Sequence, residues 1–180
     1  MSSTKTLMTV EEFAQMRTAD TEDYELVAGE LVPLASGTPK RSIIRDKLGD
    51  LLRAYFGANK LGQAIAEMDC RTIHGSIRRP DLSVFLEAKS QQLDLDEYPI
   101  PFAPDIAIEI LSPSESAIDL NRKINEYSSS GSREVWVIDY KNDELFIHGD
   151  EKSVRLIRGS DELSTPLLPG FAIRLSDLFK

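Results

Sequence analysis

Two acidic residues lie in apolar segments that alternate as β-strands do, and both have the chemistry to hold a metal ion. In the segment 105–111, Ile106, Ile108 and Ile110 face one way and Glu109 faces the other. A buried carboxylate without a partner is unfavourable or has a shifted pKa. Glu109 therefore requires a cation, a metal ion or a proton beside it.

Asp81 opens a second apolar segment, 80–86, in which Leu82 and Val84 face away from it. If the two strands are neighbours, Asp81 and Glu109 converge on one edge of a sheet. Two carboxylates from adjacent strands, completed by water, are a common way of holding Mg²⁺. A cap at the start of the strand is an equally good interpretation of Asp81 taken alone.

A lysine follows on a helix that we predict over 119–129. Leu120, Ile124 and Tyr127 recur on one stripe of this helix, and Lys123 flanks the stripe. Its ammonium group could reach the sheet and stabilise a phosphate or orient a water molecule. The alternative is an ordinary surface lysine whose stem lies along the protein, which is the commoner arrangement for a single lysine.

The composition is that of one globular domain over residues 1–180. Of the 180 residues, 41% are hydrophobic and 28% are charged. The 21 basic and 30 acidic residues give a net charge of −9, which argues against general coating of nucleic acid but leaves open a local basic groove or a metal-bridged contact. Cys70 is the sole cysteine, and no apolar run approaches the ~20 residues of a membrane span. We expect a cytoplasmic protein without disulfides.

Local patterns predict the elements that must position these side chains. Apolar spacing favours helices over 9–17, 41–56 and 119–129 and a last helical turn at 177–179. Strands are expected on either side of a turn at Ala28-Gly29 and at 63–73, 82–86, 105–111, 134–140, 145–148 and 154–157, with loops over 88–104 and 166–171. We therefore predict an α/β (α+β) fold, with a mixed β-sheet flanked by helices and additional β-hairpins.

Taken in order, these residues resemble the Uma2 family, which is placed in the PD-(D/E)XK nuclease superfamily. The segments that carry the resemblance are 24–30, 80–81, 109–114, Lys123 with Tyr127, and 134–139. The resemblance extends from Thr9 to the tail at 167–170 and implies a restriction-endonuclease-like core.

The resemblance also implies roles for individual residues. Asp81 and Glu109 would be the ligands of Mg²⁺ or Mn²⁺, and Glu25 would be a further acidic member of the catalytic site. The usual lysine of the superfamily falls on Leu111, so Lys123 on the following helix would take its place. From the residues alone, Glu25 could equally pair with a basic residue on a neighbouring strand.

The basic residues of the second predicted helix are the candidate nucleic-acid contacts, above all Arg41 and Arg45. Arg41 stands where many relatives carry histidine; if that position touches the scissile phosphate, the resemblance implies that a proton-transfer role is lost there and a charge-clamp role remains. A solvated helix face is an equally good interpretation of these residues.

Together these features favour a metal-dependent endonuclease that hydrolyses DNA phosphodiester bonds, with DNA as a transient partner. The alternative is a catalytically silent nuclease fold that serves as a binding or assembly module, which the net charge and Leu111 favour. A metal-dependent phosphoester hydrolase with a small substrate is a third hypothesis. By analogy with other nuclease folds we expect a homodimer.

Overall fold

A six-stranded mixed sheet is the centre of the fold. The computed structural model describes residues 7–16, 23–34, 37–112, 115–150 and 153–180. The strands of this sheet are, in spatial order, β10 (Val154–Arg158), β9 (Glu144–His148), β8 (Glu134–Asp139), β7 (Ile106–Ile110), β6 (Leu82–Leu86) and β3 (Gly62–Ala66). Strands β7 and β8 are parallel, and the other pairs are antiparallel. The predicted mixed sheet is confirmed.

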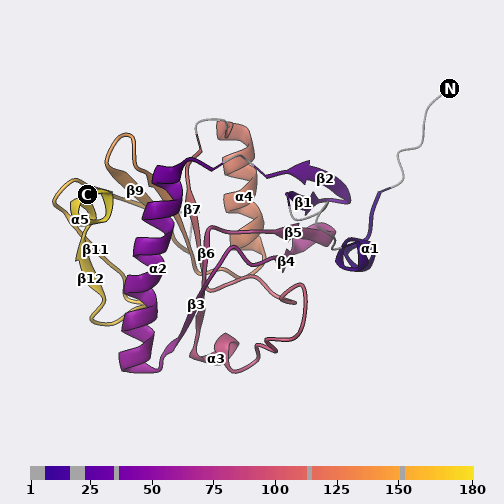
Figure 1. Cartoon of the computed structure of the whole chain (residues 1–180), viewed down its shortest axis with the longest axis horizontal. Helices are drawn as coiled ribbons and strands as arrows, with labels where there is room; N and C mark the ends of the chain where they lie inside the picture. The colour runs from indigo at the N-terminus through magenta and orange to yellow at the C-terminus, as the bar shows by residue number, and fades with distance from the viewer. Residues whose placement is uncertain (1–6, 17–22, 35–36, 113–114, 151–152) are drawn as a thin grey trace.

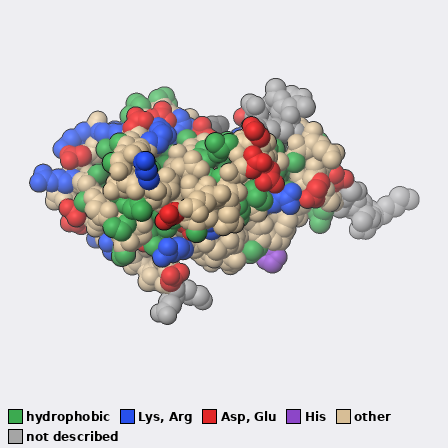
Figure 2. Space-filling model, turned by 90° about the horizontal axis from the view of Figure 1, so that it is seen from below, with side chains coloured by type: hydrophobic (Ala, Val, Ile, Leu, Met, Phe, Trp, Pro, Cys, Tyr) green, Lys and Arg blue, Asp and Glu red, His purple; other side chains and the backbone are tan. Residues whose placement is uncertain are grey.

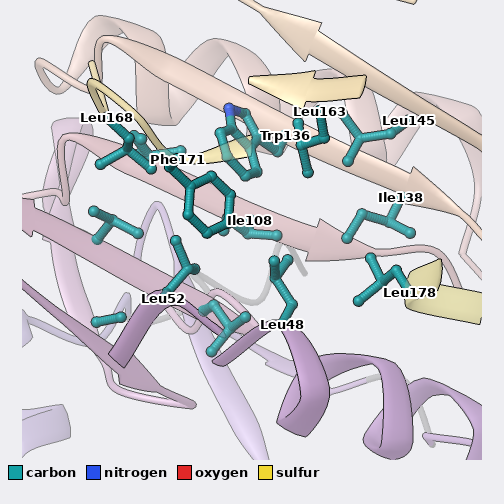
Figure 3. Packing of buried hydrophobic residues seen from close by; sticks show 14 of the residues in the cluster. Leu48, Leu52, Ile108, Trp136, Ile138, Leu145, Leu163, Leu168, Phe171 and Leu178 are labelled. Carbon is teal, nitrogen blue, oxygen red and sulfur yellow. The ribbon is translucent and has the colours of Figure 1, made fainter. Parts of the chain in front are cut away.

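Two helices cover opposite faces of this sheet, α2 (Pro39–Asn59) and α4 (Ala117–Ser129) (Figure 1). Leu48 and Leu52 of α2 pack toward Ile108 and Trp136, and the C-terminal segment closes this core with Phe171 (Figure 3). On the other face, a smaller cluster joins Ala107, Val135 and Val137 of the sheet to Ile124 and Tyr127 of α4. Alternate side chains of β7 therefore face two different hydrophobic cores, as the alternation predicted for residues 105–111 requires.

A smaller four-stranded sheet lies beside the main one (Figure 1). Its strands are, in spatial order, β2 (Glu30–Pro33), β1 (Tyr24–Val27), β5 (Ser76–Arg78) and β4 (Cys70–Thr72). Strands β1 and β2 turn at Ala28 and Gly29, whose φ angles are 48° and 84°, as a tight hairpin turn requires. The helix α1 (Val10–Gln15) packs on this sheet through Val10 and Phe13, against Leu26 and Ile77.

Side-chain caps determine where the helices begin. The hydroxyl of Thr9 accepts from the backbone N–H of Glu12, whose carboxylate accepts from Thr9 N–H, so a capping box begins α1. Ser116 caps α4 through the N–H of Asp119, so this helix begins two residues earlier than predicted. Helix α2 begins at Pro39 after the cap Thr38. The predicted end of the first helix at Arg17 and the motif residues 113–114 lie outside the described residues.

Three predictions about the elements are wrong. The strand predicted over 63–73 is two strands in different sheets, because the chain turns at Glu67, whose φ is 49°. The loop predicted from residue 88 begins with a short helix, α3 (Glu87–Ser90), and a single 3₁₀ turn, η1 (Ile73–Gly75), precedes β5. The C-terminal region contains a hairpin, β11 (Glu162–Ser164) and β12 (Ala172–Arg174), before the predicted helical turn, α5 (Leu175–Phe179). In the described ranges, no helix has the length and apolar composition to cross a membrane.

Gly62, at the start of β3, provides a test of the sheet edge. Its φ is 148°, and a Cβ added there would lie 2.1 Å from the carbonyl oxygen of Phe85. We expect Gly62→Ala to lower the free energy of unfolding by about 2–3 kcal/mol in urea titrations. The control is Gly57→Ala on the exposed surface of α2, where a Cβ meets nothing within 4 Å and should stabilise by about 0.5–1 kcal/mol. Equal effects of the two substitutions would contradict this account.

Candidate active site

Asp81 and Glu109 meet where β6 and β7 pair. The antiparallel register joins Leu82 to Ile108, which places Asp81 and Glu109 opposite each other one position further on. The backbone N–H of Ile110 donates to Asp81 Oδ2 at 2.7 Å. Only 3% of Asp81 and 1% of Glu109 are exposed. The structure therefore brings the two predicted carboxylates together in a buried position.

Glu109 has two partners from α4. The hydroxyl of Tyr127 donates to Glu109 Oε1 at 2.8 Å, and Lys123 Nζ lies 3.4 Å from Oε2. Burial raises the pKa of Glu109 to about 7, although the Lys123 ammonium group acts in the opposite direction. The charges of Asp81 and Glu25 raise this pKa further. Glu109 therefore changes its protonation state near neutral pH.

Lys123 points toward the sheet, so the interpretation as an ordinary surface lysine is wrong. Its side chain is 13% exposed, and its Nζ also lies 3.1 Å from Glu115 Oε1. Burial by itself lowers the pKa of Lys123, but the charges of Glu109, Glu25 and Glu115 outweigh this effect and raise it. Lys123 is therefore a permanent cation beside Glu109.

Arg41, on α2, is the cation that pairs with Asp81. Its Nη2 lies 2.8 Å from Asp81 Oδ1 and 2.9 Å from Oδ2, and its Nε donates to the carbonyl oxygen of Ile110 at 3.0 Å. Burial raises the pKa of Asp81, and the contacts with Arg41 and with the Ile110 N–H oppose this shift. Arg45, one turn further along α2, pairs with Asp46 and Glu67 instead. Contact of either arginine with nucleic acid stays a prediction.

Glu25 pairs with an arginine of the neighbouring strand, as the alternative interpretation had it. Its Oε2 accepts from Arg78 Nη1 at 2.9 Å, and its Oε1 accepts from the backbone N–H of Arg79 at 2.8 Å. Arg78 also donates to both carboxylate oxygens of Glu126 on α4, at 2.6 and 3.0 Å. Glu25 and Lys123 line one cavity of about 400 Å³, so Glu25 lies at the edge of the same site.

The charges of this cluster do not balance. It contains three cations, Arg41, Arg78 and Lys123, and five carboxylates, Glu25, Asp81, Glu109, Glu115 and Glu126. When all of these groups are ionised, an excess of two negative charges remains, which one divalent cation would neutralise. In the described ranges, no three His, Cys, Asp or Glu side chains are grouped as metal ligands. Mg²⁺ commonly takes only one or two carboxylates and completes its shell with water and substrate phosphate, so Asp81 and Glu109 fit this ion.

Four residues of the cluster had no predicted role in the site: Tyr127, Glu115, Arg78 and Glu126. Tyr127 could have been found, because it follows Lys123 by four residues and so lies on the same side of the helix. Arg78 and Glu126 are 48 residues apart, and no local pattern connects them.

A mixed sheet covered by α2 and α4, with two carboxylates and a lysine where β6 and β7 pair, defines a restriction-endonuclease-like nuclease fold. A crystal structure described as "a putative nuclease belonging to DUF820", from Anabaena variabilis ATCC 29413, has this fold with a TM-score of 0.83 and 21% sequence identity, covering 96% of this chain and 97% of that one. The model of the Uma2 family, described as "Putative restriction endonuclease", matches residues 10–176. The chain belongs to the Uma2 family. No curated protein matches it.

Proposed function

We propose that this protein is a metal-dependent endonuclease that hydrolyses DNA phosphodiester bonds. The observation that carries the proposal is the convergence of Asp81, Glu109 and Lys123 in a buried cluster that carries two excess negative charges when all of its groups are ionised. Membership of the Uma2 family and the nuclease fold support it. Asp81 and Glu109 would hold Mg²⁺ or Mn²⁺ through carboxylate oxygens.

Lys123, Tyr127 and Glu115 would have distinct tasks in this chemistry. A bound metal ion would supply a polarised phosphate and a water molecule of lowered pKa. Lys123 would bind a phosphate oxygen and stabilise the negative charge that develops during cleavage. Tyr127 orients Glu109, and Glu115 restrains the ammonium group of Lys123. The cavity beside Lys123 offers about 400 Å³ to the nucleic acid that flanks the cleaved bond.

The direct test is cleavage of supercoiled plasmid and single-stranded DNA with Mg²⁺, Mn²⁺ or EDTA. We expect metal-dependent nicking by the wild type and its loss in Asp81→Asn. Asp69→Asn is the matched control, because Asp69 is also buried and paired with an arginine, Arg79, but does not belong to the cluster. Nicking that survives in Asp81→Asn would indicate a contaminating nuclease. The absence of nicking with every metal and substrate would contradict the proposal.

Lys123 provides a quantitative prediction. We expect Lys123→Met to lower the cleavage rate about a hundredfold, because the stem is kept and the charge near the phosphate is lost. Lys89→Met is the control, since Lys89 is another partly buried lysine, which bonds Ala103 and Gly131 oxygens away from the cluster. Melting temperatures would show that both variants fold. A Lys123→Met rate within a few-fold of the wild type would exclude this role.

A second candidate function, a nuclease fold without catalysis that binds other molecules, is favoured by the pairing of Arg41 with Asp81. On the face shown in Figure 2, acidic and basic side chains are interspersed with uncharged ones. A binding module predicts that Mn²⁺ leaves the melting temperature unchanged. If the protein is an enzyme, Mn²⁺ should raise the melting temperature of the wild type, and Glu109→Ala should abolish this rise.

The homodimer stays a prediction, which light scattering would test.

A further inference from the structure

We infer that the guanidinium of Arg41 competes with the divalent cation for Asp81, so that the metal ion binds as Arg41 moves out. Because this competition takes Asp81 as a metal ligand, it rests on the proposed function. Arg41 would also contact the substrate, because the guanidinium that the metal ion displaces becomes available to a phosphate of the DNA.

The contacts of Arg41 are those of a bound cation. Its Nη2 lies within 2.9 Å of both carboxylate oxygens of Asp81, and its Nε donates to the carbonyl oxygen of Ile110. Charge-assisted hydrogen bonds of this length are strong. Carboxylate and backbone carbonyl oxygens are also the ligands that hard divalent cations take from proteins. The guanidinium therefore occupies oxygens that a metal ion would use.

The Asp81 carboxylate has few free lone pairs left for a metal ion while Arg41 is in place. Its Oδ2 accepts from Arg41 and from the backbone N–H of Ile110, and its Oδ1 forms an ion pair with Arg41 Nη2 at 2.8 Å. A divalent cation bound at Oδ1 would lie beside a guanidinium of like charge at a side chain that is 3% exposed. Such repulsion is weakly screened in a buried position, so the two cations exclude each other.

Arg41 is placed so that it can leave without a change of fold. It is the third residue of α2, and its backbone N–H donates to the capping hydroxyl of Thr38. Its side chain is 19% exposed, whereas that of Asp81 is 3% exposed. Rotation of this long side chain toward the solvent therefore requires no movement of the helix. The outward position faces the solvent from which a DNA backbone would approach.

The test measures Mn²⁺ binding to the full metal-free chain by electron paramagnetic resonance, without any cleavage assay. We expect Arg41→Gln to bind Mn²⁺ at least tenfold more tightly than the wild type. Arg45→Gln is the matched control, because Arg45 lies one turn further on α2 with a side chain 18% exposed but pairs with Asp46 and Glu67. It removes the same charge and should leave the affinity within about twofold. Asp81→Asn should lose Mn²⁺ binding.

A second measurement separates competition from a general effect of charge. In Arg41→Ala, millimolar methylguanidinium should occupy the vacated position and weaken Mn²⁺ binding several-fold, while the wild type should not respond. Equal Mn²⁺ affinities of wild type and Arg41→Gln, with loss in Asp81→Asn, would overturn the competition and leave the metal site intact. The absence of Mn²⁺ binding in every variant would overturn both the competition and the metal dependence of the proposed function.

Discussion

Arg78→Met is expected to lower the free energy of unfolding by about 3–5 kcal/mol. Arg78 is 4% exposed and bonds two carboxylates, Glu25 on β1 and Glu126 on α4. Methionine fills a similar volume but leaves both carboxylates buried without their shared cation. Removal of one partner from a buried ionic group is costly because the remaining charges have lost their contact with water. Urea titrations at neutral pH in EDTA would measure the effect.

Two controls identify the cause of this loss. Arg158→Met removes an arginine whose pair with Glu144 is largely exposed, with 64% of the Arg158 side chain accessible, and should cost less than about 1 kcal/mol. Introducing Arg78→Met together with Glu25→Gln and Glu126→Gln should recover much of the stability, because no uncompensated charge remains. A loss from Arg78→Met no greater than that from Arg158→Met would contradict the buried triad.

The stability of the metal-free protein is expected to fall by about 2–3 kcal/mol between pH 5 and pH 8 through Glu109 alone. Its pKa rises from 4.5 to about 7 on folding, chiefly because the carboxyl group is buried. Between these two values the folded state holds a proton that the unfolded state has released. The folded state therefore binds more protons, so stability decreases as the pH rises and the decrease ends above about pH 7.

The comparison of wild type with Glu109→Gln isolates this effect, because every other titrating group is common to both. The difference between their free energies of unfolding in EDTA should change by about 2–3 kcal/mol over the same pH interval. Mg²⁺ should stabilise the wild type increasingly as the pH rises, since a metal ion binds the ionised carboxylate. Parallel pH profiles of the two proteins would contradict the raised pKa of Glu109.

The sequence by itself determined the features that depend on short-range patterns. The alternation of three isoleucines with Glu109 predicted both the strand β7 and the side of the sheet that carries the carboxylate. Ala28 and Gly29 predicted the hairpin turn, and the apolar spacing over 9–17 predicted the first helix. Such features can be predicted from the sequence because strand alternation, turns and helical spacing involve residues within a few positions of one another.

Only the tertiary structure decided which charges meet. Whether Lys123 pointed to the solvent or to Glu109 depended on the packing of α4 against the sheet. The pairing of Arg41 with Asp81 joins residues 40 positions apart, and that of Arg78 with Glu126 joins residues 48 positions apart. Contacts of this kind follow from strand register and from the position of helices on a sheet, which local periodicity does not specify. The residue types of the site could therefore be predicted from the sequence, but which of their charges pair with one another is decided by the fold.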